Sequence, residues 1–224
     1  MKGYNFKIIP VFADVIAPDA EMAAKISAIR APHEAMLSEV IGRTETLLYR
    51  RDILNGTFDD VICDALIAER DAEIALSPGV RWGNALLPDS DITHEDITNA
   101  TALTYPAAYR TAMTGARLKD VLEDLADNLF NPDPYYQQGG DMVRVGGVSY
   151  TIDVSQGIGN RISDLTLIRT GQRLDPAKEY AVAGWASVSE GTEGPPIWDV
   201  VTDHIRRKRT VAPRETGRVR VVGI

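Results

Sequence analysis

The sequence contains very few of the residues that build disulfides and transition-metal sites. Among its 224 residues there is one cysteine, Cys63, so no internal disulfide can form. The three histidines, His33, His94 and His204, are too scattered to indicate a first-row metal centre. No stretch approaches the roughly 18 apolar residues of a transmembrane helix, and the first six residues lack the pattern of a signal peptide. These absences argue against a disulfide scaffold, a membrane span and a metal site in this chain.

The composition is otherwise that of an ordinary globular protein. Hydrophobic residues make up 44% and charged residues 25% of the chain, which excludes disorder and simple fibres. The length suits one large domain or two small ones. The net charge is −8, from 24 basic and 32 acidic residues, whereas a protein that binds the nucleic-acid backbone is normally basic. We therefore expect neither nucleic acid nor a membrane as a partner.

The first 43 residues predict a strand followed by a helix. Apolar residues alternate from Tyr4 towards Ala13, Asp19 can cap a helix, and Pro32 would kink or split that helix. A chain that starts inside a structural element resembles a piece of a longer protein, although a short natural N-terminus gives the same pattern. The helix is either a linker from an upstream part or an ordinary amphipathic helix, and the residues favour neither.

The rest of the chain, residues 44–224, predicts an α+β fold with a mixed sheet and flanking helices. Buried-face periodicity indicates helices over residues 52–70 and 114–130 and in a segment ending at the basic run 206–209. Short apolar or alternating segments predict strands at residues 44–48, 74–76, 148–152, 165–168, 180–185 and 218–222. Cys63 adjoins the buried face of its helix, so we interpret it as a small core residue.

Residues 77–84, directly after a predicted buried strand, form the first candidate site. Pro78 and Gly79 force a turn, and Arg81 offers a planar fork of donors for phosphate, sulfonate or carboxylate oxygens. Trp82 and Asn84 could add stacking and hydrogen bonds. The alternative is a tight turn with a solvated arginine and a packed tryptophan, which the spacing alone favours.

Residues 131–144 form the second candidate site. Within fourteen residues this loop gathers paired aromatics, amides and glycines with an acid and an arginine; the candidates are Tyr135, Tyr136, Gln138, Gly139, Gly140, Asp141 and Arg144. Tyrosines combine an apolar body with a polar tip and are frequent at recognition sites. A loop of this length in a compact domain is more often functional than idle. The alternative is an Ω-loop packed by its own aromatics.

Other charged or glycine-containing segments have simpler interpretations. Residues 93–96 are interpreted as a helix start or an acidic turn, and the run 206–209 complements the end of a helix. The acidic residues of the third helix are interpreted as its solvated face; they are Asp120, Glu123, Asp124 and Asp127. Gly157 and Gly159 lie between predicted strands and so do not fit a phosphate-binding loop.

The order of these segments resembles the C-terminal domain of the 5′-nucleotidase family. The resemblance rests on residues 58–66, 72–81, 91–93, 114–123 and 174–176. More narrowly, residues 80–84, 104–106 and 131–144 resemble the SoxB subfamily, the thiosulfohydrolases of bacterial sulfur oxidation. Residues 6–12 resemble the last strand before the linker helix of that subfamily. The expected division is therefore 1–43 as the end of an upstream domain with its linker helix, and 44–224 as the substrate-recognition domain.

The resemblance implies a substrate-facing role for this chain. An upstream metallophosphoesterase domain would hold two metal ions, manganese in the SoxB subfamily, and the catalytic histidine; none of those motifs occurs here, so we expect no catalytic residue and no metal ligand in this chain. By position, Arg81 matches the substrate-binding arginine of the family's Gly-Gly-x-Arg turn. The second-loop candidates would line the substrate channel.

The implied reaction is release of sulfate from a cysteine-bound thiosulfonate on the carrier protein SoxYZ, in the periplasm. Residues 184–191 lack the aromatic and double-glycine arrangement that nucleotidases use to stack a base, which argues against nucleoside recognition. The alternatives are a 5′-nucleotidase or 2′,3′-cyclic phosphodiesterase domain and a stand-alone binding module. In each case we expect this chain alone to bind no metal pair and to turn over nothing.

Overall fold

The structure is a computed structural model that describes residues 3–12, 14–80, 83–101, 105–187, 191–213 and 218–223. The chain separates into two compact units, Met1–Ser38 and Glu39–Ile224. Each unit is described by itself. The predicted division after residue 43 falls inside the first strand of the second unit, β1 (Val40–Thr44).

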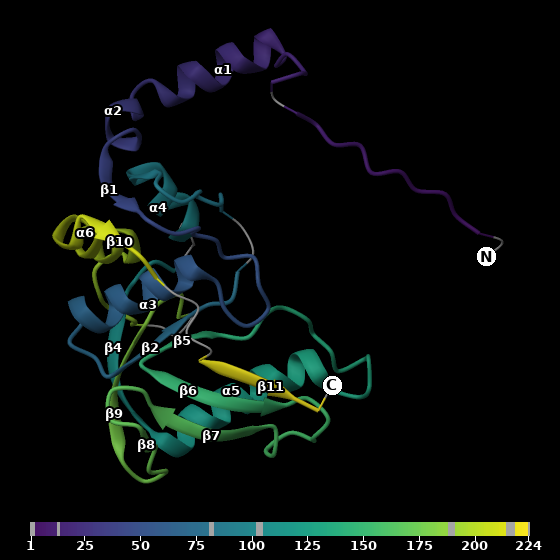
Figure 1. Ribbon diagram of the computed structural model, residues 1–224, viewed down its shortest axis with the longest axis vertical. Helices are drawn as coiled ribbons and strands as arrows, with labels where there is room; N and C mark the ends of the chain where they lie inside the picture. Colours follow the sequence, from purple (N-terminus) through teal and green to yellow (C-terminus); the bar gives the residue numbers. More distant parts are fainter. Residues whose placement is uncertain are drawn as a thin grey trace. The chain divides into compact units, whose positions relative to one another are not determined.

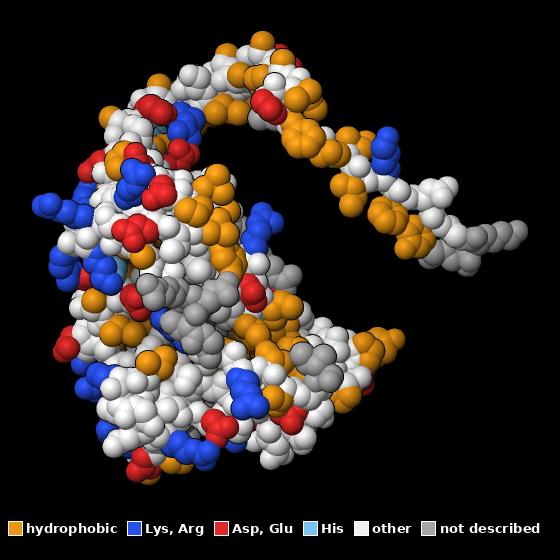
Figure 2. All heavy atoms as spheres, viewed as in Figure 1, with side chains coloured by type: hydrophobic (Ala, Val, Ile, Leu, Met, Phe, Trp, Pro, Cys, Tyr) orange, Lys and Arg blue, Asp and Glu red, His pale blue; other side chains and the backbone are white. Residues whose placement is uncertain are grey.

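The first unit holds two helices and an extended segment. Helix α1 (Ala20–Arg30) begins as predicted at Asp19, whose carboxylate accepts a hydrogen bond from the Met22 amide at 2.8 Å. The helix ends before Pro32, and a short helix, α2 (Glu34–Leu37), follows. Residues 3–12 are extended but form no strand, contrary to the prediction, because no described strand of this unit pairs with their backbone. Hydrophobic side chains are exposed along both the segment and the helix (Figure 2).

The second unit is a mixed α+β body (Figure 1). Its helices are α3 (Thr57–Glu69), α4 (His94–Thr101), α5 (Gly115–Phe130) and α6 (Ile197–Lys208). After β1, its strands are β2 (Ile74–Ser77), β3 (Asp91–Thr93), β4 (Tyr109–Thr114), β5 (Arg144–Gly146), β6 (Val148–Asp153), β7 (Ile162–Leu167), β8 (Gln172–Arg173), β9 (Glu179–Gly184), β10 (Thr210–Val211) and β11 (Val219–Val222). They form three sheets in the orders β10-β1-β3, β11-β6-β7-β8 and β4-β9-β2-β5.

The β4-β9-β2-β5 sheet separates two hydrophobic cores. Side chains of a strand alternate between its faces, and all four residues of β2 are buried. Ala75 packs into a core with α3 and α6, whereas Ile74 and Leu76 pack into a second core with α5 and β6. Residues on both faces of β2 are therefore covered, which explains why its sequence is a continuous apolar run.

Most predicted elements are confirmed, and the α+β class with mixed sheets and flanking helices is confirmed. The strand expected at residues 44–48 was wrong: it lies at β1, because Thr44 ends the strand in a turn, its hydroxyl donating to the Thr46 carbonyl at 2.7 Å. Helix α3 begins five residues later than expected. The start of α4 is confirmed near residue 93, where the Asp96 carboxylate accepts from the Thr93 amide and hydroxyl at 2.8 and 2.6 Å. Among the described residues, no helix is long and apolar enough to cross a membrane.

Candidate functional site

The two candidate loops leave the same end of the β4-β9-β2-β5 sheet. Strands β2 and β5 are antiparallel neighbours with Ser77 opposite Arg144. The loop that follows β2 and the loop that precedes β5 therefore lie side by side. They also touch: a β-carbon added to Gly79 would lie 2.5 Å from the Met142 carbonyl oxygen and 2.7 Å from the Asp141 β-carbon. Glycine at position 79 is thus required by the close approach of the second loop.

The structure places the predicted site residues at different depths. Arg81 and Trp82 lie outside the described residues. The exposed candidates are Asn84, Tyr135, Tyr136, Gln138, Gly139 and Gly140. Tyr135 is 96% exposed and Tyr136 66% exposed, so neither tyrosine packs the loop from within as the Ω-loop alternative requires. Both rings are available for contact with a partner molecule.

Arg144 lies beneath the loop and does not project from it. Its side chain is fully buried, with the Met142 carbonyl at 3.1 Å and the carbonyls of Asp52 and Ile53 as further acceptors. The carboxylate of Asp141 lies 3.6 Å from its Nη2 and is itself almost fully buried. In this position Arg144 and Asp141 support the loop, and they reach a substrate only through the residues they hold.

The second loop is fixed at both ends by hydrogen bonds. At its start the Asp133 amide donates to the Asn131 side chain at 3.0 Å, and the Gln137 side chain donates to the Asn131 carbonyl at 2.7 Å. Further along, the Gly139 amide donates to the Asn128 carbonyl and the Met142 amide to the Ile53 carbonyl, each at 3.1 Å. These anchors hold the segment that carries the two exposed tyrosines.

The backbone conformation of this loop explains why two glycines follow each other in it. Gly139 and Gly140 have φ angles of 80° and 93°, a region that other residues rarely adopt. A β-carbon at either position would meet nothing within 4 Å. The backbone conformation of the turn, and not a shortage of space, therefore requires glycine here.

A buried ion network lies under both loops. The carboxylate of Asp59, in the first turn of α3, accepts a hydrogen bond from Arg50 Nε at 2.7 Å and lies 3.3 Å from Arg144 Nε. All three side chains are almost completely buried. Burial raises the pKa of Asp59 to about 6, and Arg50 and Arg144 oppose that rise, so the carboxylate is mainly ionised at neutral pH and compensates part of the charge of the two guanidinium groups.

Arg50 and Asp59 are the site residues that the sequence analysis missed. No local pattern marks Arg50, and Asp59 is one residue of the run 58–66 that carries the family resemblance. The one available signal was the pair of acids, Asp59 and Asp60, inside the apolar run that forms α3. A buried helix face rarely accepts a carboxylate without a cationic partner.

The acidic face of α5 is a second correction. Asp120 and Asp124 are exposed as predicted, but Glu123 is buried and accepts hydrogen bonds from the amides of Gly159, Arg161 and Ile162 at 2.8, 3.2 and 2.7 Å. Glu123 therefore ties α5 to the β6–β7 loop, because three peptide donors compensate its burial.

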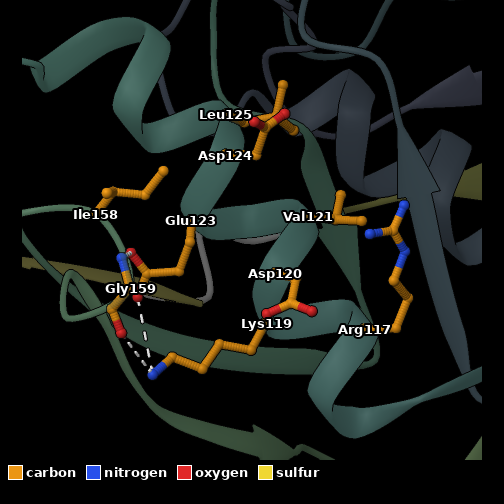
Figure 3. Close-up of a pocket in the computed structure, with 9 residues that line it drawn as sticks. All are labelled: Arg117, Lys119, Asp120, Val121, Glu123, Asp124, Leu125, Ile158 and Gly159. Atoms are coloured by element: carbon orange, nitrogen blue, oxygen red, sulfur yellow. Dashed lines mark hydrogen bonds and ion pairs between the residues drawn. The ribbon is translucent and has the colours of Figure 1, made fainter.

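Figure 3 shows the groove of about 700 Å³ beside this carboxylate. The Lys119 ammonium donates to the Gly159 carbonyl at 3.0 Å and lies 3.8 Å from Glu123. The central polar groups of the groove thus bond one another, and none of the predicted site residues lines it. We do not assign the functional site to this groove.

Cys63 and Trp185 are both buried core residues. Cys63 is fully buried, as predicted, and burial raises the pKa of its thiol, so it is a core residue. Trp185 is also buried; its indole donates to the Ser77 hydroxyl at 2.8 Å. It packs under the first loop and presents no exposed ring on which a base could stack. Among the described residues, no group of three or more His, Cys, Asp and Glu side chains could hold a metal ion.

The fold, with two loops at one end of the β4-β9-β2-β5 sheet, defines the class of the protein. The family model of the 5′-nucleotidase C-terminal domain matches residues 40–203, so the chain belongs to that family, as the sequence analysis predicted. Within it, the chain is similar to the sulfate thiohydrolase SoxB of Thermus thermophilus, solved in complex with glycerol, at 36% identity and a TM-score of 0.84. That match covers 92% of this chain and 40% of the SoxB chain.

More distant solved structures share the fold. A 5′-nucleotidase precursor, also from Thermus thermophilus, is 18% identical with a TM-score of 0.73, over 93% of this chain and 44% of its own. The NAD nucleotidase of Haemophilus influenzae is 16% identical with a TM-score of 0.68, over 91% and 41%. No curated protein matches the chain. The chain thus spans less than half the length of each of these proteins.

Proposed function

We propose that this chain is the substrate-recognition part of a SoxB-type hydrolase that removes a sulfonate group, as sulfate, from a cysteine-bound thiosulfonate on a carrier protein of the SoxYZ type. The observation that carries the proposal is the 36% identity to SoxB over 92% of the chain, twice the identity to the nucleotidases. The burial of Trp185 supports it, since the one tryptophan of this segment does not expose its ring for a base to stack on.

The proposed reaction is a hydrolysis. Water adds to the sulfonate sulfur, the sulfur–sulfur bond breaks, hydrogen sulfate leaves, and the carrier cysteine keeps a persulfide. The two manganese ions that the resemblance implies do not fit the described residues of this chain, which hold no suitable ligand group. We assign them to an upstream metallophosphoesterase domain, and this chain's role is confined to recognition and positioning. Location in the periplasm is part of the same proposal.

Each loop has a proposed task. Arg81 binds sulfonate oxygens, because a guanidinium presents a planar fork of donors to such groups. Asn84 and Trp82 assist it from the same loop. Tyr135 and Tyr136, exposed on an anchored loop, contact the carrier protein, since amphipathic rings held in place lose little entropy on binding. Gln138, Gly139 and Gly140 continue that contact surface.

The first test measures sulfate release. A protein that joins this chain to its metallophosphoesterase domain is assayed with a thiosulfonate-loaded carrier and with AMP. We expect sulfate release, a loss of about 10²-fold or more in kcat/KM for Arg81→Ala, and little change for Arg220→Ala, an exposed arginine on β11. Turnover of AMP without sulfate release would support the nucleotidase alternative, and binding without turnover would support the stand-alone module.

The second test separates the carrier from the sulfonate. Tyr135→Ala and Tyr136→Ala are expected to raise KM for the loaded carrier several-fold but to leave hydrolysis of a small thiosulfonate unchanged. Ile158→Ala, which removes an exposed apolar side chain in the groove of Figure 3, serves as the matched control. Equal effects on the carrier and the small substrate would contradict the assignment of the tyrosines to the carrier.

A further inference from the structure

Asp59 lies between two arginines that belong to different parts of the chain. Its Oδ1 accepts from Arg50 Nε at 2.7 Å, and its Oδ2 lies 3.3 Å from Arg144 Nε. Arg50 precedes α3 and Arg144 begins β5, so ninety-four positions of sequence separate the two guanidinium groups that share this carboxylate. Local sequence spacing cannot bring about such an arrangement.

Each guanidinium holds a different loop. Arg50 donates from Nη2 to the Pro78 carbonyl at 2.8 Å and from Nη1 to the Ala100 carbonyl at 2.6 Å. Pro78 is in the first loop, three residues before Arg81, and Ala100 is near the end of α4. Of these two backbone acceptors, only Pro78 belongs to the first loop, so Arg50 holds the start of that loop and ties it to α4.

Arg144 does the same for the second loop. It donates from Nη1 to the Met142 carbonyl at 3.1 Å, its Nη2 lies 3.6 Å from the Asp141 carboxylate, and it also donates to the carbonyls of Asp52 and Ile53. The Met142 amide in turn donates to Ile53 at 3.1 Å. The end of this loop is therefore fastened to the segment before α3 through Arg144.

The three charged side chains of this network are buried and hold one another in place. Asp59 and both arginines are at most 2% exposed, so none of them can exchange its partner for water without opening the structure. Only a guanidinium can bond a carboxylate and several carbonyls at once in one plane. The Arg50 guanidinium also lies over the Trp185 ring, 5.9 Å from its centroid.

We propose that Asp59 is a positioning residue that couples the two substrate-facing loops, acting through Arg50 on Pro78, at the start of the first loop, and through Arg144 on Asp141 and Met142, at the end of the second. The coupling is a property of this chain; its effect on turnover rests on the proposed function. Within the described part of the chain, Asp59 pairs with the two arginines, and it acts through them.

The test is hydrogen–deuterium exchange of the 224-residue chain, read in peptides that cover residues 76–84 and 139–143. Asp59→Asn keeps the shape of the side chain but removes the charge that both guanidinium groups face. We expect exchange to become about tenfold faster in both peptides, in line with the loss of one charge-assisted hydrogen bond, to Arg50, and one ion pair, with Arg144. Arg50→Lys should accelerate mainly the first peptide and Arg144→Lys mainly the second.

Asp60→Asn is the matched control. Asp60 is the next residue of α3, is 1% exposed, and pairs with Arg218 at 2.9 Å. Arg218 donates to the Val145 carbonyl at 3.2 Å, which is why the second peptide is read only as far as residue 143. We expect it to leave both loop peptides within about twofold of the wild type. Unchanged exchange in both loops of Asp59→Asn, or equal acceleration by Asp60→Asn, would overturn the coupling. If Asp59→Asn does not fold, the two lysine variants are the test. The proposal is overturned if each lysine variant accelerates exchange in both peptides equally, or if neither variant accelerates exchange in either peptide.

The activity arm separates this inference from the proposed function. In the protein with its metallophosphoesterase domain, Asp59→Asn is expected to raise KM for the loaded carrier with a smaller change in kcat, and Asp60→Asn to do neither. If wild type and Arg81→Ala release sulfate equally, the proposed function of the first loop fails while the exchange result stands. If Arg81→Ala is impaired but Asp59→Asn matches wild type in KM and in exchange, the coupling fails alone.

Discussion

The contact between the two loops at Gly79 gives the sharpest prediction for this chain. Replacing Gly79 by alanine places a β-carbon 2.5 Å from the Met142 carbonyl oxygen and 2.7 Å from the Asp141 β-carbon. Both distances are far below van der Waals contact, and the nearest atom belongs to the backbone. The neighbour cannot simply rotate away, because Met142 is held by Ile53 through its amide and by Arg144 through its carbonyl.

The expected cost follows from overpacking. Forcing a methyl group into a filled site typically destabilises a protein by about 1–3 kcal/mol. Replacing glycine by alanine also removes freedom from the unfolded chain, which contributes a stabilisation of about 0.4–1 kcal/mol wherever the backbone allows it. Gly157→Ala measures that second effect alone, because Gly157 lies outside the positive-φ region and a β-carbon there would meet nothing within 4 Å.

The assay is urea unfolding followed by tryptophan fluorescence. The three tryptophans, Trp82, Trp185 and Trp198, all belong to the unit Glu39–Ile224, so the signal reports that unit. We expect Gly79→Ala to be at least about 1 kcal/mol less stable than Gly157→Ala, with an unchanged dependence on urea. A difference below about 0.5 kcal/mol, the usual error of such comparisons, would refute the close contact of the two loops.

Three further predictions concern buried groups. Glu123→Gln should lower the free energy of unfolding by about 1–3 kcal/mol, because an amide cannot accept from three peptide donors as the carboxylate does, whereas the exposed Asp124→Asn should be near neutral in the same urea titration. Cys63 should not react with a thiol reagent in the native chain and should react fully in urea, since its thiol is buried and its pKa is raised; rapid native labelling would contradict this. Burial and the nearby Lys208 lower the pKa of His204 against the opposing effect of Glu69, so its contribution to stability is present above its unfolded pKa of about 6.5 and is lost as pH falls below it. His204→Asn should therefore lose less stability than wild type between pH 7.5 and 5.5, and parallel losses would show that His204 does not titrate as described.

Several features of the fold follow from local sequence alone. The cap at Asp19, the break at Pro32 and the cap at Thr114, whose side chain accepts from the Arg117 amide at 3.2 Å, are all confirmed. Each depends on residues within a few positions of one another, and such local interactions can be predicted from residue type and spacing. The end of α5 before Pro132 has the same local origin.

The errors have a shared cause. The predicted strand over residues 4–13 has the right alternation but no described partner within its unit, and alternation cannot supply one. Glu123 lies on a helix that is acidic on one side. The amides that donate to its buried carboxylate come from residues 159–162, about forty positions away. In both cases the deciding contact lies outside the window that a sequence pattern covers.

By itself the sequence determined the α+β class, the family, the absence of an internal disulfide and the two loops with unusual composition. The tertiary structure alone decided that these loops meet at Gly79 and that Arg144 supports the second loop from below. It also decided that Arg50 and Asp59 take part. Charged side chains are buried only where partners from distant segments compensate the loss of hydration, and the pairing of those segments is a property of the folded chain.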